Sequence, residues 1–254
     1  MRLRHFLPAF ILFQALTSWA REEESSGSGR DKLVIVGDST ACNYTKGMPY
    51  RGWGQFVHYY LKDDLEVVDL ARPGRSTKTF MTDGSWKGAL KLKPKFILIQ
   101  FGTNDAHDPH AKEAVDAEVS YRLFLEHYVD GALAISAIPI LISPAHPRVF
   151  GKDRKVMDVF PGYDLRGYEQ TMREVATSRG VAMVDLYEAS RELYDKMGPE
   201  QSAQFDPVFK DKIHFNIIGA KAMTELVMRR LPKVEPRIKD HLAAPPQMFS
   251  DAQE

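Results

Sequence analysis

The chain has 254 residues, and its 34 lysines and arginines balance its 34 aspartates and glutamates, so the formal net charge is zero. A chain of this balance has no broad electrostatic attraction for nucleic acid or for an anionic membrane surface. The single cysteine, Cys42, excludes an intrachain disulfide, and 44% hydrophobic residues suit one globular domain with a core of its own. We expect Cys42 to be a small buried residue of that core rather than a nucleophile.

The first twenty residues have the pattern of a secretory signal peptide. A short basic stretch, "MRLRH", precedes the apolar stretch "FLPAFILFQALTSWA", which ends in small residues and predicts cleavage near Ala20. A membrane anchor is the alternative, but the stretch is short for a span of about 20 residues. Residues 21–31, "REEESSGSGRD", are polar and rich in glycine and serine, so we expect a flexible spacer. The mature chain is therefore expected to be secreted or periplasmic.

Short apolar runs alternate with segments of helical spacing along the rest of the chain. Five runs predict strands that are covered on both faces: "LVIV" (33–36), "EVVDL" (66–70), "FILIQ" (96–100), "IPILI" (138–142) and "VAMVD" (181–185). Strands and helices in alternation predict an α/β fold, in which a five-stranded parallel sheet lies between two layers of helices.

Two apolar stripes at helical spacing indicate helices next to this sheet. The first consists of Trp53, Phe56, Val57, Tyr60 and Leu61. The second consists of Ile218, Ala222 and Leu226, with Asn216 as the candidate N-cap. We expect the domain to cover residues 32–232. Residues 233–254 are polar and rich in proline, so a loosely ordered tail is expected there.

Polar residues and glycines follow three of the predicted strands directly. The segment "GDST" (37–40) follows the first strand, "ARPGRSTKTF" (71–80) the second and "FGTNDA" (101–106) the third. Because parallel strands end at the same edge of a sheet, these segments are expected to meet there, where such folds bind ligands. Near the C-terminus, "DKIHFNIIGA" (211–220) places an aspartate three residues before a histidine, in front of the last predicted helix.

The residue types in these segments suit acyl transfer. A serine needs an imidazole to take its proton, so we interpret Ser39 as a nucleophile and His214 as its base. Asp211 can accept the second ring N–H of His214 and fix its tautomer. The backbone N–H groups of Ser39 and Gly74 and the side-chain amide of Asn104 would form an oxyanion hole. Each motif alone also fits a turn or a helix cap, but their attachment to successive strand ends favours a catalytic site.

The four segments together resemble the SGNH (GDSL-type) hydrolases, whose four sequence blocks centre on Ser, Gly, Asn and His. The similarity to the rhamnogalacturonan acetylesterase-like branch is closer and extends from about Leu33 to Leu231. It is carried by "GDST", "GRSTKTF", "IQFGTNDA", "SPAHPRVF", "VDLYEASRELYDKMGPE" and "DKIHFNIIGA". The resemblance implies a flavodoxin-like three-layer α/β/α sandwich without cofactor or metal, and the same roles for the five site residues. Asp69, Thr103 and Phe150 depart from the residues common in that family.

The expected substrate is an acetylated polysaccharide. Candidate contacts are Arg75 and Arg148, whose guanidinium groups suit a uronate carboxylate, Trp86, which could stack on a sugar, and His107. Basic residues after the second, third and fourth strands predict a positive rim that favours a pectin over a neutral xylan: Arg72, Arg75, Lys78, His107, His110, His146 and Arg148. A metal site at His107 and His110 is the less favoured alternative.

These observations predict a serine esterase that removes acetyl groups from a plant cell-wall polysaccharide, with acetylated rhamnogalacturonan as the first choice. A xylan acetylesterase is one alternative. A lipid-directed esterase or thioesterase of the same superfamily is another, and a wide apolar cleft would favour it. A non-catalytic carbohydrate-binding protein on the same fold is the third. The sequence leaves the oligomeric state open.

Overall fold

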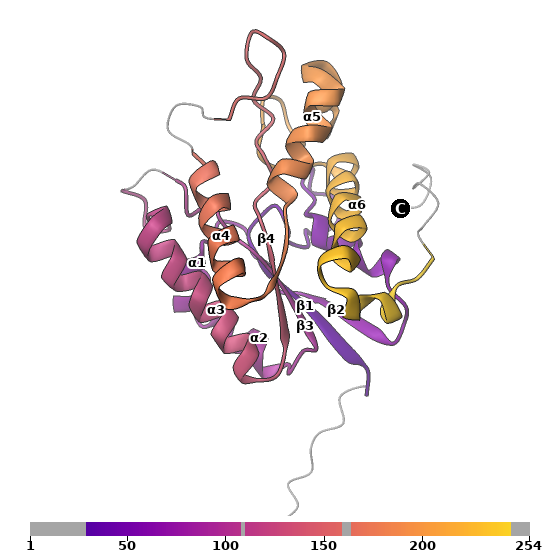
Figure 1. The fold of residues 1–254 in the computed structure, drawn as a ribbon. Helices are drawn as coiled ribbons and strands as arrows, with labels where there is room; N and C mark the ends of the chain where they lie inside the picture. Colours follow the sequence, from indigo (N-terminus) through magenta and orange to yellow (C-terminus); the bar gives the residue numbers. More distant parts are fainter. Residues whose placement is uncertain (1–28, 108–109, 159–163, 245–254) are drawn as a thin grey trace, which may run out of the picture.

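The computed structural model describes residues 29–107, 110–158 and 164–244. Five parallel strands form a sheet in the order β2-β1-β3-β4-β5, with helices on both of its faces (Figure 1). This order and the layers confirm the predicted flavodoxin-like three-layer sandwich. The predicted signal peptide at residues 1–20 lies outside the described residues, as does most of the predicted spacer.

All five predicted strands are present, and they agree with the apolar runs to within two residues at each end. They are β1 (Asp31–Gly37), β2 (Leu65–Asp69), β3 (Phe96–Gln100), β4 (Ile138–Ile142) and β5 (Ala182–Val184). Asp31, which we assigned to the spacer, is the first residue of β1. The central strands are buried along almost their whole length, because helices cover both faces of a parallel sheet.

Alternate side chains of each strand face the two helical layers. Val34 and Val36 pack in the same cluster as helices α1 to α4, whereas Leu33 and Ile35 pack with η1, α5 and α6. The first layer consists of α1 (Thr77–Thr82), α2 (Ser85–Lys91), α3 (Arg122–Ala134) and α4 (Arg166–Arg179). The second consists of η1 (Trp53–Tyr60), α5 (Leu186–Ser202) and α6 (Ile217–Val234). Short helical segments complete the fold: η2 (Ala117–Tyr121), η3 (Ala203–Phe205) and η4 (Pro236–His241).

Helix α6 begins where the sequence predicts but buries a different face. Asn216 caps it as expected, because its side chain accepts the N–H of Gly219 at 3.0 Å. Ile218, however, is 47% exposed, and the buried side of the helix contains Ala220, Met223, Val227 and Leu231. Two contacts with other elements determine which face of α6 is buried. A side chain at Gly219 would collide with Phe205, and the hydroxyl of Thr224 donates to the carbonyl of Trp53 at 2.7 Å.

The predicted loose tail is wrong for residues 233–242. Helix α6 continues to Val234, and η4 then packs back on the domain with Ile238 fully buried. The imidazole Nδ1 of His241 lies 2.9 Å from a carboxylate oxygen of Asp64, and Leu242 pairs with Leu61. Residues 245–254, the rest of the predicted tail, lie outside the described residues. None of the helices in the described part of the chain has the length and apolar character that crossing a bilayer requires.

Asp69, at the end of β2, makes the stability of the fold depend on pH. Its Oδ1 accepts the N–H of Ala71 at 2.9 Å, but its buried Oδ2 has no hydrogen-bond partner among the described residues. Burial raises the pKa of this carboxyl group to about 7, although the Ala71 N–H acts in the opposite direction. The folded state therefore holds a proton that the unfolded chain releases near pH 4, so this contribution to stability is lost as the pH rises to about 7.

We expect Asp69→Asn to be more stable than the wild type at pH 8, because the amide keeps the bond to Ala71 without ionising. The wild type should lose up to about 1.4 kcal/mol per pH unit more than the variant between pH 4 and 7. Urea unfolding of both proteins at pH 5, 6.5 and 8 measures this difference. Parallel curves over that range would contradict the raised pKa of Asp69.

Candidate active site

Ser39 lies in a tight turn directly after β1, and the turn is fixed by its neighbours. The N–H and the hydroxyl of Thr40 donate to Oδ1 of Asp38 at 2.8 and 2.7 Å, and the Thr40 hydroxyl also lies 3.0 Å from Oε1 of Gln100. Burial raises the pKa of Asp38, against the effect of these donors. The start of η1 contacts the same turn, since the N–H of Trp53 donates to the carbonyl of Thr40 at 3.0 Å. The serine is therefore held by a rigid frame.

The structure brings Ser39, His214 and Asp211 into one hydrogen-bonded chain. The Oγ of Ser39 lies 3.0 Å from Nε2 of His214, across 175 positions of sequence. The other ring nitrogen, Nδ1, lies 2.9 Å from Oδ2 of Asp211. This is the geometry in which an imidazole can take a proton from a hydroxyl while a carboxylate fixes its tautomer.

Asp211 is held as a carboxylate by the chain around it. Its Oδ1 accepts the backbone N–H groups of His214 at 2.9 Å and of Ile213 at 3.1 Å. Burial alone would raise the pKa of Asp211, but these N–H groups and the imidazole outweigh it and lower the pKa below its ordinary value. An ionised carboxylate at this position accepts the Nδ1–H of His214, so Nε2 is left without a proton and faces Ser39.

Gly74 and Asn104 lie at the same edge of the sheet as Ser39, and all three line one pocket. Gly74 has a φ of +71°, a left-handed conformation that glycine adopts without strain, and a Cβ there would point into open space. The amide of Asn104 donates to the carbonyl of Arg75 at 3.1 Å, which ties it to the segment of Gly74. Because an amide nitrogen carries two hydrogens, Asn104 keeps a second donor for a ligand.

The buried carboxyl group of Asp105 connects the segment that follows Gly74 to the loop that carries Asn104. Oδ1 of Asp105 accepts the N–H of Thr77 at 3.0 Å and its hydroxyl at 2.5 Å. The hydroxyl of Tyr168 donates to the carbonyl of Asp105 at 3.1 Å. Burial raises the pKa of Asp105 to about 7, although both Thr77 donors act against it. The loop after β3 is therefore anchored to α1 and α4, which fixes the amide of Asn104.

The pocket has a volume of about 670 Å³, and much of its wall is apolar or aromatic. It is lined by Ser39, Tyr44, Met48, Tyr50, Pro73, Gly74, Thr103, Asn104, His107, Ile213 and His214. The ring of Tyr50 lies 5.6 Å from the imidazole of His214, edge to face, and 5.8 Å from the ring of Tyr44. Neither tyrosine was predicted from the sequence as a site residue. Their position in the segment directly after the Ser39 turn was the available signal.

The comparisons with known proteins agree with this arrangement. The family model for the GDSL-like lipase/acylhydrolase family matches residues 35–222. The chain belongs to this family. The probable rhamnogalacturonan acetylesterase YesY of Bacillus subtilis (strain 168) is 29% identical over 218 residues, which are 82% of this chain and 98% of that protein. Rhamnogalacturonan acetylesterase RhgT of the same organism is 25% identical over 228 residues, which are 84% of this chain and 94% of that protein.

A solved structure also supports this membership. The crystal structure of the Bacillus subtilis protein YxiM superposes with a TM-score of 0.71 at 25% identity, and the match covers 80% of this chain. This chain spans 56% of that longer one. Family and relatives together support a carboxylic ester hydrolase, in agreement with the resemblance that the sequence motifs carry.

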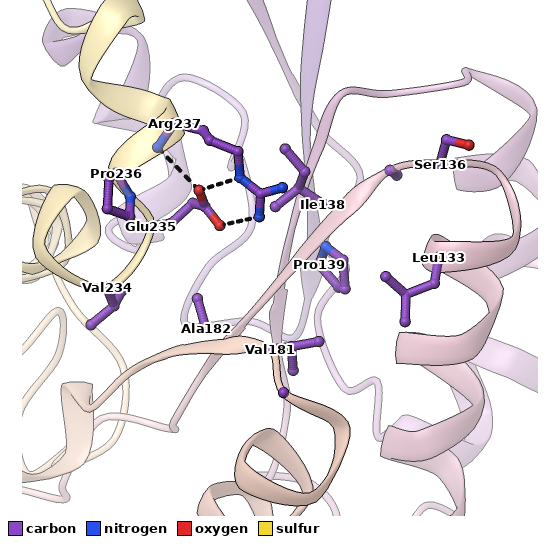
Figure 2. Close-up of a pocket in the computed structure, with 12 residues that line it drawn as sticks. Leu133, Ser136, Ile138, Pro139, Val181, Ala182, Val234, Glu235, Pro236 and Arg237 are labelled. Carbon is purple, nitrogen blue, oxygen red and sulfur yellow. Dashed lines mark hydrogen bonds and ion pairs between the residues drawn. The ribbon is translucent and has the colours of Figure 1, made fainter.

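A second pocket of this GDSL-like hydrolase lies at the amino ends of β4 and β5, at the opposite end of these strands from Ser39 (Figure 2). The described residues that line it include no histidine and no cysteine. Its charged groups bind each other, since Oε1 of Glu235 accepts the Nε–H of Arg237 at 2.6 Å and Oε2 accepts from Nη2 at 2.6 Å. The described lining of this pocket includes Ser136 but no histidine that could act as its base, as His214 can for Ser39.

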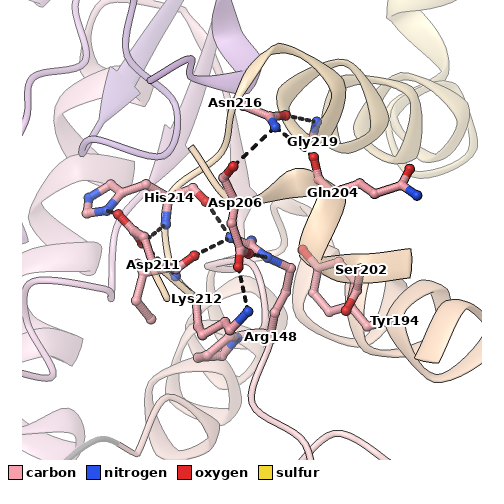
Figure 3. A network of polar contacts seen from close by, with 12 residues as sticks. Arg148, Tyr194, Ser202, Gln204, Asp206, Asp211, Lys212, His214, Asn216 and Gly219 are labelled. Carbon is pink, nitrogen blue, oxygen red and sulfur yellow. Dashed lines mark hydrogen bonds and ion pairs between the residues drawn. The ribbon is translucent and has the colours of Figure 1, made fainter. Parts of the chain in front are cut away.

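Two of the four predicted substrate contacts are wrong because the side chains are buried elsewhere. Trp86 is 7% exposed and packs in α2 against Tyr128, with ring centres 4.8 Å apart, so no sugar can stack on it. Arg148 is 1% exposed and donates to Asp206 and to carbonyl groups of the His214 loop (Figure 3). Neither residue lines the pocket of Ser39.

Of the other two predicted contacts, Arg75 lies outside the pocket and His107 lines it. Arg75 does not line the pocket, and its Nε donates to Asp83 at 2.7 Å, so its contact with substrate stays a prediction. His107 does line the pocket, and its Nδ1 lies 3.0 Å from Oε1 of Glu113. Its contact with substrate stays a prediction. In the described part of the chain, no group of three or more His, Cys, Asp or Glu side chains could hold a metal ion.

The predicted positive rim is wrong for two of its members, which are buried, and most of the others do not line the pocket. His146 and Arg148 are buried at 2% and 1% exposure, and Arg75 pairs with Asp83. Of the seven basic residues that we assigned to the rim, His107 alone lines the pocket in the described residues. The residues that line the pocket therefore give no charge-based reason to prefer a pectin. Cys42 is buried as predicted, and burial raises the pKa of its thiol to about 12.

Proposed function

We propose that the protein is a serine acetylesterase that removes acetyl groups from a plant cell-wall polysaccharide, with acetylated rhamnogalacturonan as the substrate. The observation that carries the proposal is the chain from Ser39 Oγ to His214 Nε2 at 3.0 Å and from His214 Nδ1 to Asp211 at 2.9 Å. Its position in a pocket with Gly74 and Asn104 provides donors for an oxyanion at the same place.

In the proposed reaction, His214 Nε2 takes the hydroxyl proton as Ser39 Oγ bonds to the acetyl carbon. The carbonyl oxygen becomes an oxyanion and accepts from the N–H groups of Ser39 and Gly74 and from the amide of Asn104. His214 then gives the proton to the sugar oxygen, which leaves as a hydroxyl group. A water molecule attacks the acetyl-serine by the same route, His214 again moves the proton, and acetate and free Ser39 result.

The choice of rhamnogalacturonan rests on YesY and RhgT, whose names both include rhamnogalacturonan acetylesterase. The charged rim that we predicted gives no support, because most of its members do not line the pocket. Tyr44 and Tyr50 provide aromatic surface on which a sugar ring could stack instead. The resemblance also makes a xylan acetylesterase the nearest alternative polysaccharide activity.

One observation favours a second candidate, an esterase or thioesterase for longer acyl chains. Tyr44, Met48, Tyr50, Pro73 and Ile213 make the pocket wide and largely apolar. Each methylene group that such a wall buries contributes about 0.8 kcal/mol, or roughly a fourfold gain per carbon. A pocket built for acyl chains would therefore favour octanoate over acetate, whereas an acetyl pocket would not.

Acetate release from acetylated rhamnogalacturonan and acetylated xylan, together with p-nitrophenyl esters from acetate to octanoate, tests the proposal. We expect kcat/KM to be highest for acetylated rhamnogalacturonan among the polymers and for acetate among the p-nitrophenyl esters. Because few charged side chains line the pocket, the ratio between the two polymers should not change with salt. A preference for octanoate would support the second candidate, and equal rates on both polymers would remove the pectin assignment.

We also propose that residues 1–20 direct export of the chain to a secreted or periplasmic location. The support is the basic and apolar pattern of that segment, which ends with the small residues Ser18 and Ala20 at the two positions that a signal peptidase requires to be small. N-terminal sequencing of the mature protein after expression in a bacterial host tests this. A mature chain that still begins at Met1 would refute it.

A further inference from the structure

Residues 211–214 present both His214 and Asp211 to Ser39, and we call them the acid–base loop. Nη2 of Arg148 donates to the backbone carbonyl of Asp211 at 3.0 Å and to that of His214 at 2.5 Å (Figure 3). The backbone N–H of Arg148 donates to the carbonyl of Lys212 at 2.9 Å. One residue therefore holds three carbonyl groups of a four-residue loop.

Arg148 is a rigid anchor because its charge is buried and balanced. Its side chain has no exposed area, and its Nε donates to Oδ1 of Asp206 at 2.9 Å. The second oxygen of Asp206 pairs with the ammonium group of Lys212 at 2.5 Å, so the loop is tied to the same carboxylate. The guanidinium also lies 5.0 Å from the ring centre of Phe215. A buried charge with these partners is costly to move, which makes its position well defined.

The orientation of His214 depends on the backbone that Arg148 holds. Oδ1 of Asp211 accepts the N–H groups of Ile213 and His214, so the carboxylate moves together with the loop. Arg148 itself belongs to the segment after β4, which is part of the sheet that also carries Ser39. A shift of the loop would therefore change the distance between His214 and Ser39, and a misplacement of about 1 Å can cost about 100-fold in rate.

We propose that Arg148 is a positioning residue for ester hydrolysis, which fixes the acid–base loop so that His214 Nε2 stays within reach of Ser39 Oγ. Arg148 does not line the pocket, so it acts through His214 and Asp211 and not on the substrate. The guanidinium group suits this role because its planar fork serves Asp206 and two carbonyl groups at once, which a single ammonium cannot. The inference rests on the proposed function, since it requires His214 and Asp211 to act in hydrolysis.

The test compares Arg148→Met with the wild type on p-nitrophenyl acetate, because methionine removes the donors while filling much of the same volume. We expect kcat to fall about 100-fold. We expect KM to stay within about threefold of the wild-type value, because binding groups are unchanged. The NMR resonance of the His214 Nδ1 proton, which Asp211 shares, should shift or broaden. Far-UV circular dichroism and the melting temperature show whether the variant is folded.

Arg173→Met is the matched control. Arg173 also binds two carboxylates, of Glu169 and Asp185, but it lies in α4 and does not line the pocket. We expect this control to keep the wild-type kcat and the wild-type histidine resonance. A folded Arg148→Met protein with the wild-type kcat overturns the proposal. A raised KM with an unchanged kcat also overturns it, because the substitution would then affect substrate binding and not the proton transfer by His214.

Arg148→Lys tests the positioning role of Arg148 if the methionine variant does not fold. Lysine keeps a positive charge beside Asp206 but cannot also donate to both carbonyls, so we expect near-wild-type melting with kcat lowered by more than about tenfold. A wild-type kcat in this variant overturns the proposal. Failure of the proposed function would look different, since the wild type itself would then be inactive on p-nitrophenyl acetate. Inactivity on the polysaccharides alone would refute only the proposed substrate.

Discussion

Replacing Ser39 with alanine is expected to lower kcat for acetate release by more than about 1,000-fold, because no other group can form the acyl intermediate. The fold should be retained. The Oγ of Ser39 makes its hydrogen bond to His214, at the edge of an open pocket, and a bond of this kind contributes about 1 kcal/mol. The turn around Ser39 is held by Asp38 and Thr40, and these bonds do not involve the serine hydroxyl.

The measurement is acetate release by purified Ser39→Ala, with its melting temperature recorded in the same buffer. Cys42→Ala is the matched control, because its buried thiol lies outside the pocket and contacts Ser39 only at the backbone carbonyl, at 3.8 Å. We expect the control to keep most of its activity. If folded Ser39→Ala keeps more than about a tenth of the wild-type kcat, far above what loss of a nucleophile permits, Ser39 is not the nucleophile.

The sheet and the place of the site could be predicted because both depend on local patterns and one topological rule. Five apolar runs mark the strands, since a strand covered on both faces must be apolar throughout. Once the strands are parallel, their carboxyl ends must share an edge, so Ser39, Gly74 and Asn104 meet there regardless of their separation in sequence. Asp211 and His214 could be placed beside them by the resemblance of the four blocks.

The environment of individual side chains could not be predicted, because it depends on packing between distant elements. Trp86 looked like a sugar contact in a loop-rich region, but the approach of α3 buries it against Tyr128 and Gly131. Arg148 looked like a surface cation, yet its partners Asp206 and His214 lie 58 and 66 positions later in the chain. No periodicity or composition near either residue reports such contacts.

Two other features that were not predicted, the pair Tyr44 and Tyr50 and the ordered segment η4, had partial signals in the sequence. Tyr44 and Tyr50 are aromatic residues in a short segment that returns to the Ser39 turn, and segments tied to a site at both ends often line it. The ordered segment η4 was hidden by its composition, because prolines and charges usually mark a loose tail. Here Pro236 starts a short helix, and Ile238 is the apolar residue that docks it on the domain.

Asp211→Asn is expected to lower kcat by about 1,000- to 10,000-fold while keeping the loop in place. The amide oxygen can still accept the N–H groups of Ile213 and His214, as Oδ1 of Asp211 does. The amide nitrogen, however, would face Nδ1 of His214 and donate to it, where Oδ2 now accepts. His214 would then carry its proton on Nε2, directed at Ser39, and could not take the hydroxyl proton.

The fold offers a close control in a second histidine–aspartate pair. Nδ1 of His241 lies 2.9 Å from Oδ2 of Asp64, which matches the distance between His214 and Asp211. Neither residue lines the pocket of Ser39, so Asp64→Asn should reduce stability at most and leave kcat near the wild-type value. The comparison needs kcat on p-nitrophenyl acetate and urea unfolding for both variants. Equal losses of kcat in the two variants, or an Asp211→Asn protein within about tenfold of the wild type, would show that the carboxylate of Asp211 does not set the tautomer of His214 for catalysis.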